Sequence, residues 1–271
     1  ALLLKLRRDP ETAACLVDIK NVPELTLMER DNTGMISIGA AATMTELKQS
    51  TLVRSYLPAL AQAAEVMGCR EIQNRATLGG NLANASPSAE TAIALMIYNA
   101  QVHLVSLSGM RSVVLADFLV APGKTVLAPG ELIAKVVIAP ADVDGAQSRY
   151  LRAGRIRGMD LATVGIAVWF SLVGRERFRI AAGAVFPVVT RMTGLETYLN
   201  NQGTIADDKL AHARTLFAQA IQPRTHSLRG SPAEKRHIGG ALLVRALREV
   251  IAAAESEGGE GDGPIPDHSN D

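Results

Sequence analysis

The residues best suited to chemistry are concentrated in one run, Asn74-Arg-Ala-Thr-Leu-Gly-Gly-Asn-Leu-Ala-Asn-Ala-Ser-Pro-Ser-Ala-Glu90. Two adjacent glycines, Gly79 and Gly80, stand between the hydroxyl of Thr77 and the amide of Asn81. Paired glycines tolerate positive φ and carry no Cβ, so consecutive backbone N–H groups can converge on an anion. We therefore predict a bend at Gly79-Gly80 that binds a phosphate or diphosphate. An ordinary tight turn is the alternative for such a pair.

Hydroxyl and carboxylate groups follow at Ser86, Ser88 and Glu90. They suit hydrogen bonding to ribose or ribityl hydroxyls, although the same residues also make a good helix N-terminus, with Ser86 as the predicted N-cap of a helix reaching about Asn99. The run contains neither a Gly-Lys-Ser/Thr sequence nor Gly-x-Gly-x-x-Gly. A Walker loop and a Rossmann nucleotide site are therefore not predicted.

The flanking sequence predicts a mixed α/β domain and then an α+β domain. A strand over Met35–Ala42 leads into a capping box at Thr43–Glu46, and a helix runs from Pro58 to the stop at Gly68. Further strands are predicted at Val102–Val105, Arg111–Leu115 and Leu132–Ile138, an antiparallel hairpin at Val164–Val173 and Phe178–Phe186, and helices at Ala206–Ala220 and Ala233–Ala254.

Length and charge divide the chain into three segments. The 271 residues, 48% of them hydrophobic, suffice for two domains. Residues 1–143 contain 12 Lys+Arg and 13 Asp+Glu, residues 144–256 contain 16 and 9, and residues 257–271 contain none and 5. We predict domains at 1–143 and 144–256, and a disordered acidic tail at 257–271.

Composition excludes several classes. Two cysteines cannot hold an iron–sulfur cluster or a four-cysteine zinc site, and their sparing use is typical of the cytoplasm. The five histidines show no ligand spacing, so no metal is predicted, and no apolar run is long enough to span a membrane. The excess of basic residues from residue 144 onward suggests nucleic-acid binding as one hypothesis. The chain has few aromatic residues for stacking on bases, however, which favours a solvated or subunit-facing surface.

The chain resembles the FAD-binding medium subunit of the molybdenum hydroxylases, the family of xanthine dehydrogenase and carbon monoxide dehydrogenase. The resemblance covers nearly the whole chain, and Thr77–Pro87 is its most specific part. The motifs that carry it are Leu16-Val-Asp-Ile-Lys-Asn-Val-Pro-Glu-Leu25, Ile38-Gly-Ala40, the Asn74–Pro87 run, Leu127-Ala-Pro-Gly-Glu-Leu132, Met159-Asp-Leu-Ala-Thr-Val164, Arg179-Ile-Ala-Ala-Gly-Ala-Val185 and Ser227-Leu-Arg-Gly-Ser-Pro-Ala-Glu-Lys-Arg236.

The resemblance implies a fold and a set of cofactor-binding residues. The fold is α+β: a two-part FAD-binding domain of the vanillyl-alcohol-oxidase (PCMH) type, then a smaller C-terminal domain with an antiparallel sheet and flanking helices. The diphosphate is expected at the Thr77–Asn81 loop, the polar chain of FAD at Ser86 and Glu90, and the flavin near Met67, Ile133 and Arg152. The implied cofactor-binding residues are Met67, Thr77, Leu78, Gly79, Gly80, Asn81, Ser86, Glu90, Ile133 and Arg152.

The resemblance also implies a function. Such a chain carries FAD in a heterotrimeric oxidoreductase, taking electrons from two [2Fe–2S] clusters in a small subunit and passing them to an external acceptor, while a molybdenum–pterin cofactor in a large subunit performs the substrate chemistry. A dimer of heterotrimers is expected, with no catalytic acid or base on this chain. The family's first glycine-rich loop precedes an apolar run like Leu2-Leu-Leu-Lys-Leu6, where this sequence begins. A flavin-free structural subunit is therefore the alternative, and the substrate and the acceptor stay open.

Overall fold

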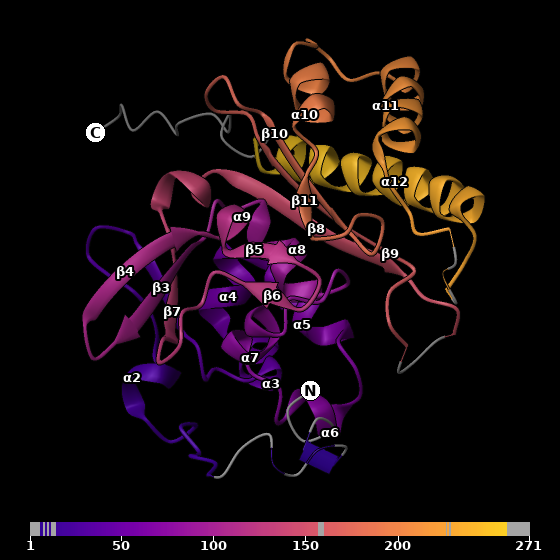
Figure 1. The fold of residues 1–271 in the computed structure, drawn as a ribbon. Coiled ribbons are helices and arrows are strands. Elements are labelled where there is room, and N and C mark those ends of the chain that lie inside the picture. Colours follow the sequence, from indigo (N-terminus) through magenta and orange to yellow (C-terminus); the bar gives the residue numbers. More distant parts are fainter. Residues whose placement is uncertain are drawn as a thin grey trace, which may run out of the picture.

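The computed structural model describes residues 6–7, 9, 11, 15–156, 160–225, 227 and 229–258. Two antiparallel sheets organise this part of the chain, one with five strands and one with four (Figure 1). Helices from both halves of the sequence cover them, which confirms the predicted α+β class.

The first sheet has the strand order β1-β2-β7-β3-β4, and all its neighbouring strands are antiparallel. Its central strand, β7, confirms the strand predicted at Leu132–Ile138. A separate two-stranded ribbon, formed by β5 and β6, precedes β7 in the sequence. The elements of this half are α2 (Pro23–Thr26), β1 (Met28–Arg30), β2 (Ile36–Gly39), α3 (Met44–Gln49), α4 (Thr51–Tyr56), α5 (Pro58–Val66), α6 (Arg70–Gln73), α7 (Leu78–Ala83), α8 (Glu90–Met96), β3 (Gln101–Ser106), β4 (Gly109–Val114), α9 (Leu115–Phe118), β5 (Leu119–Ala121), β6 (Lys124–Thr125) and β7 (Leu132–Ile138).

Local sequence signals fix the helices that lead to the glycine pair. The predicted capping box is present: Thr43 accepts a hydrogen bond from the Glu46 amide, and the Glu46 carboxylate accepts one from the Thr43 amide. Pro58 opens α5, and Gly68, with φ of 62°, follows its end as predicted. The helices that these signals begin and end lead directly into α6 and α7.

The second sheet has the order β11-β10-β9-β8. Its β9–β10 pair confirms the predicted hairpin, with Phe170 opposite Phe178 in the register. Strand β8 and helix α10 were not predicted from the sequence, and the last helix, which was predicted to end at Ala254, continues to Gly258. The elements of this half are β8 (Ala146–Ala153), β9 (Val164–Ser171), β10 (Phe178–Gly183), β11 (Thr190–Arg191), α10 (Thr193–Asn200), α11 (Asp207–Ala220) and α12 (Pro232–Gly258), after a 3₁₀ turn at Pro140–Asp142.

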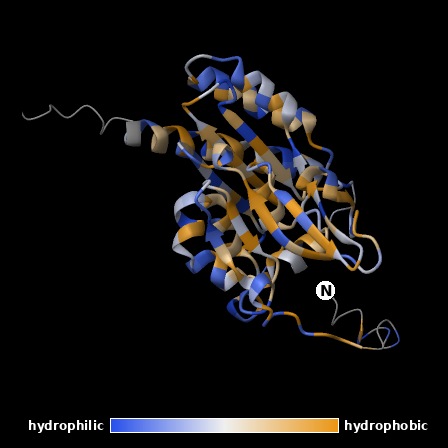
Figure 2. Ribbon diagram, turned by 90° about the vertical axis from the view of Figure 1, so that its left-hand side faces the viewer, coloured by the Kyte–Doolittle hydropathy of each residue, from blue (hydrophilic) through white to orange (hydrophobic). Residues whose placement is uncertain are grey.

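The second sheet is buried on both faces. Side chains alternate along its strands, and each face packs against a different hydrophobic cluster. Ile166 and Val168 face α10–α12 in one hydrophobic cluster, whereas Ala167 and Trp169 belong to the cluster of the first half. Every residue of β9 is buried. Figure 2 shows the hydrophobic strands running through the centre of the molecule, with hydrophilic segments in the outer helices and loops.

The end of the chain differs slightly from the prediction. Helix α12 continues to Gly258, so residues 257 and 258 are helical, and the rest of the predicted acidic tail lies outside the described residues. Among the described residues, no helix combines the length and the hydropathy needed to cross a bilayer.

Candidate cofactor-binding site

A cleft of about 920 Å³ lies beside the Thr77–Glu90 run. This volume is within the range of clefts that hold large organic ligands. Its walls come from the end of α5, from α6 and α7, from the turn before α8, and from the segment before β9. The lining residues are Met67, Gly68, Ile72, Arg75, Ala76, Thr77, Gly80, Asn81, Ala83, Asn84, Ser86, Ser88, Ala89, Glu90, Asp160 and Leu161.

The glycine pair is helical, so the predicted bend with positive φ is wrong. Gly79 and Gly80 lie in the first turn of α7, and neither is among the glycines with positive φ. Thr77 is the N-cap, and its Oγ1 accepts a hydrogen bond of 3.1 Å from the Gly80 amide. The amide of Leu78 donates to the Ala42 carbonyl, and that of Gly79 donates to the Ala40 carbonyl at 2.7 Å. These N–H groups therefore have partners within the protein and do not form an open anion nest.

Gly79 and Gly80 have different surroundings, so the lack of a side chain has a different consequence at each position. A Cβ on Gly79 would lie 2.7 Å from the Cβ of Ala40, so only glycine lets α7 approach the Ala40 backbone. Gly80 instead lines the cleft, and a Cβ there would meet only the Thr77 hydroxyl, at 3.0 Å. Gly80 is therefore the one of the pair that faces the cleft.

Asn81 connects three helices at the wall of the cleft. Its side-chain amide donates to the sulfur of Met67 at 3.4 Å, and its carbonyl oxygen accepts from the Thr91 hydroxyl at 2.7 Å. Met67 is 8% exposed and caps the C-terminus of α5. These contacts fix the orientation of both predicted site residues before any ligand binds.

Ser86 is not a helix cap, contrary to the prediction. Helix α8 begins at Glu90 with Ala89 as its N-cap, because the Pro87 carbonyl is drawn to the Ala184 amide of the second half, at 2.6 Å. The Ser86 hydroxyl instead accepts from the Ser88 amide at 3.3 Å and lies 3.2 Å from the Ser88 hydroxyl. The turn thus presents two hydroxyl groups to the cleft.

Glu90 occupies the first turn of α8 and is 4% exposed. Its carboxylate accepts from Arg152 of β8 at 3.4 Å, and Arg152 also donates to the Asp160 carbonyl at 2.7 Å. Burial raises the pKa of Glu90, and the charge of Arg152 only partly opposes this rise. The pKa of the buried Tyr150 phenol is also raised, by burial and by the negative charge of Glu90.

Four predicted site residues do not line the cleft. Leu78 is fully buried in the first core and Gly79 packs on Ala40. Ile133 lies in β7 opposite Leu104 and is 7% exposed. Arg152 lies behind the cleft wall, where it donates to the Glu90 carboxylate and to the Asp160 carbonyl.

Several lining residues were missed in the sequence. Arg75 is exposed and lies two positions before Thr77, so its position in the run was the available signal. Ile72 and Leu161, which are 44% and 46% exposed, add apolar surface at the cleft. Asn84 and Asp160 add polar groups.

These residues fit FAD in size and chemistry. A dinucleotide needs a cation or hydrogen-bond donors for its diphosphate, acceptors and donors for its sugar-like hydroxyls, and apolar contact for its rings. In the cleft, Arg75 and Thr77 can bind a diphosphate, and Ser86 and Glu90 can hydrogen-bond sugar-like hydroxyls. Met67 offers apolar contact for a ring.

Both halves of the chain match families of flavoprotein domains. Residues 1–141 match the FAD binding domain in molybdopterin dehydrogenase, and residues 149–250 match the CO dehydrogenase flavoprotein C-terminal domain. The chain belongs to the family of FAD-binding medium subunits of the molybdopterin-dependent dehydrogenases.

Individual relatives agree with this assignment. A putative xanthine dehydrogenase FAD-binding subunit of Escherichia coli is 29% identical, over 93% of this chain and 87% of its own length. The glyceraldehyde dehydrogenase medium chain of Sulfolobus acidocaldarius is 30% identical, over 87% of this chain and 82% of its own. In structure, carbon monoxide dehydrogenase from Hydrogenophaga pseudoflava matches with a TM-score of 0.84 at 27% identity, covering 93% of this chain and 86% of that one.

Proposed function

We propose that this chain is the FAD-carrying electron-transfer subunit of a heterotrimeric molybdenum hydroxylase. It would receive electrons from two [2Fe–2S] clusters of a small subunit and pass them to an external acceptor, while a molybdenum–pterin cofactor on a large subunit oxidises the substrate. The observation that carries the proposal is the cleft of about 920 Å³ along Thr77–Glu90, in a chain whose two halves both match flavoprotein domains.

Within this proposal, the residues of the cleft bind the parts of FAD as follows. Arg75, the Thr77 hydroxyl and the face of Gly80 contact the diphosphate, and Asn81 borders it. Ser86 and Glu90 hydrogen-bond the ribityl hydroxyls. A bound flavin supplies redox chemistry that exchanges electrons singly or in pairs. The protein supplies binding and orientation, and no acid or base for the hydroxylation.

Glu90 has a second role in this proposal, because burial raises its pKa and the carboxyl group therefore keeps its proton to a higher pH than an exposed carboxyl group does. A protonated carboxyl can donate to a ribityl oxygen as well as accept from a hydroxyl. Arg152 holds the group in place from the opposite side.

The organisation of the complex is also part of the proposal. We place the junction between the two domains near residue 143, between the end of β7 at Ile138 and the start of β8 at Ala146. The basic second domain, with 16 Lys+Arg against 9 Asp+Glu over 144–256, would face partner subunits. A dimer of heterotrimers in the cytoplasm is the expected assembly.

Flavin content and electron flow test this function. The complex purified with its large and small subunits should release one FAD per copy of this chain on denaturation. Removing the FAD should stop reoxidation of dithionite-reduced iron–sulfur clusters by NAD or by a soluble quinone, and adding FAD back should restore it. A colourless complex that binds no added FAD would contradict the proposal and support the flavin-free structural subunit.

A further inference from the structure

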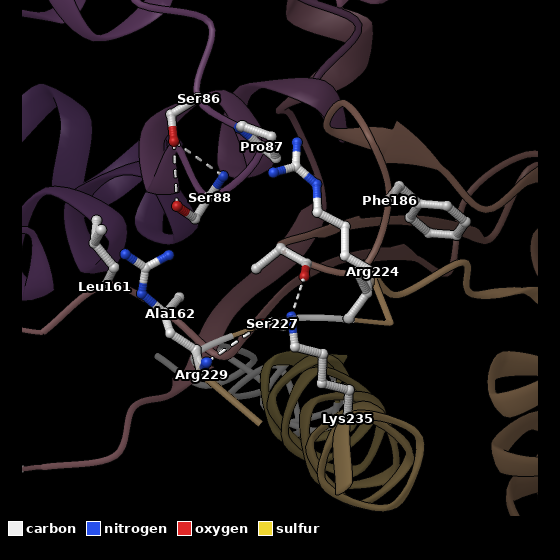
Figure 3. Close-up of a pocket in the computed structure, with 12 residues that line it drawn as sticks. Ser86, Pro87, Ser88, Leu161, Ala162, Phe186, Arg224, Ser227, Arg229 and Lys235 are labelled. Carbon is white, nitrogen blue, oxygen red and sulfur yellow. Dashed lines mark hydrogen bonds between the residues drawn. The ribbon is translucent and has the colours of Figure 1, made fainter. Parts of the chain in front are cut away.

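A second pocket, of about 300 Å³, adjoins the cleft and shares Ser86, Ser88 and Leu161 with it. It lies where the Ser86–Ser88 turn of the first half meets the end of β10 and the start of α12. Figure 3 shows Arg224 and Arg229 directed into it, with Lys235 reaching up from α12. The contacts proposed above for FAD use none of these three cations.

The charge in this pocket has one sign. Three of its lining residues, Arg224, Arg229 and Lys235, are cationic, and no lining residue is a carboxylate. Within the described part of the chain, neither arginine side chain has a hydrogen-bond or ion-pair partner. Like charges this close repel one another, so the arrangement is unfavourable without an anion.

Lys235 makes the pocket unlike an ordinary basic surface. A surface lysine keeps its ammonium in water, but Lys235 is only 5% exposed. Its Nζ donates to the Ala184 carbonyl at 2.9 Å, which leaves the other two N–H bonds available. Burial lowers the pKa of Lys235, and the charges of Arg229 and Arg224 lower it further.

The nearest carboxylate on the same helix is already occupied. Glu234 accepts from the Ser231 amide at 2.6 Å, and the Glu234 amide donates to the Ser231 hydroxyl at 3.2 Å, which forms a capping box at the start of α12. This cap orients the first turn of α12 so that Lys235 enters the pocket while Glu234 stays outside its lining.

Neutral donors complete the site. Ser227 accepts from the Arg229 amide through its Oγ, so its O–H remains free to donate. The hydroxyls of Ser86 and Ser88 lie on the opposite wall. Two guanidinium groups, one ammonium and several hydroxyls around one small volume supply the kinds of donor that bind phosphate oxygens.

We propose that this pocket is an anion-binding site that takes the phosphate or diphosphate group of an organic ligand. Two sources of that group are possible in the position described: the diphosphate of the FAD proposed for the adjoining cleft, or a second phosphate ester that binds next to it. Only the first source rests on the proposed function.

Calorimetric titration with inorganic pyrophosphate, at constant ionic strength with chloride as the reference anion, tests the site. We expect one pyrophosphate per chain. Arg224→Gln should weaken its affinity roughly 10- to 100-fold, because a charge-assisted hydrogen bond is lost. Arg224 is exposed, so this variant should fold normally. Lys235→Met should have a larger effect than Arg224→Gln and abolish pyrophosphate binding.

The control for the lysine is Lys209→Met, which removes a lysine bonded to a backbone carbonyl, at 2.7 Å to Thr204, outside the pocket. The control for the arginine is Arg245→Gln on the outer face of α12. Both controls should bind pyrophosphate like the parent protein. No binding by the parent chain, or equal losses in controls and pocket variants, would overturn the proposal.

Separate titrations with FAD distinguish the two sources. If pyrophosphate competes with FAD, and Arg224→Gln weakens both, the pocket holds the FAD diphosphate. If FAD-loaded protein still binds pyrophosphate, the site serves a second ligand. A chain that binds pyrophosphate but no FAD would refute the proposed function and leave the anion site intact.

Discussion

Gly165 of β9 and Gly183 of β10 face each other in the register of the second sheet, and Ile93 of α8 occupies the space that they leave. A Cβ would lie 2.8 Å from the Ile93 Cδ1 if placed on Gly165, and 2.4 Å if placed on Gly183. The helix that begins with Glu90 is therefore seated directly on the sheet of the other half. This contact fixes one wall of the proposed cofactor cleft.

Gly183→Ala should lower the free energy of unfolding by about 1–3 kcal/mol, because the new methyl group overpacks against Ile93 and lies 2.8 Å from the Pro87 carbonyl oxygen. Urea unfolding measures the change. The matched control is Gly194→Ala, where the added Cβ has no neighbour within 4 Å. Equal stability of the two variants would show that α8 is not seated as described.

Asp142→Ala should destabilise the protein by about 1–3 kcal/mol, because the buried Arg179 guanidinium then keeps only Glu176, at 2.9 Å, as an ionic partner. Arg179 is 6% exposed, and its Nη1 donates to the Asp142 carboxylate at 2.5 Å and to the Ile97 carbonyl at 3.4 Å. Its guanidinium also stacks on Trp169. Asp207→Ala removes an exposed partner of Arg248 and should cost about 0.5 kcal/mol or less. A small loss in both would mean that the Arg179 contacts do not join the two halves.

Glu90→Gln should change the dependence of stability on pH. The folded state holds the Glu90 proton to higher pH than the unfolded state does, because burial raises the folded pKa above its ordinary value of 4.5. Stability from this group is therefore lost as the pH rises from about 4.5 through the folded pKa. The variant cannot titrate, so its stability relative to the parent should increase over that range. A difference that stays constant, or falls, as the pH rises would contradict the raised pKa.

Arg75→Gln should weaken FAD binding about tenfold, since it removes the exposed cation beside the Thr77 cap. Quenching of flavin fluorescence during titration measures the affinity. Arg70→Gln changes a nearby exposed arginine that does not line the cleft and should have no effect. If both variants bind FAD like the parent, Arg75 has no part in holding the diphosphate.

The sequence predicted the elements whose signals are local. The Thr43–Glu46 capping box, the strand at Leu132–Ile138 and the hairpin opposing Phe170 to Phe178 all depend on short-range patterns. The prediction failed where long-range contacts decide the conformation. The carbonyls of Ala42 and Ala40 accept from the amides of Leu78 and Gly79 at the start of α7, and the Ala184 amide bonds the Pro87 carbonyl, so no helix starts at Ser86.

The distinction between local and long-range contacts also explains why only some of the predicted site residues line the cleft. Thr77, Gly80, Asn81, Ser86 and Glu90 line the same cleft because they are close in sequence, on α7, the turns that follow it and the start of α8. Replacing both Gly79 and Gly80 by Val would not test the cleft alone, because a Cβ on Gly79 would also disturb the packing on Ala40. The anion pocket needed the fold, since its cations are more than 130 positions from Ser86 in the sequence.

The location of FAD in the loaded protein tests the central claim most directly. A structure of the chain crystallised with FAD should show the cofactor in the cleft, with its polar chain along Ser86 and Glu90 and its phosphates beside Arg75 and Thr77. FAD bound elsewhere, or a cleft that stays empty at saturating FAD, would contradict the account.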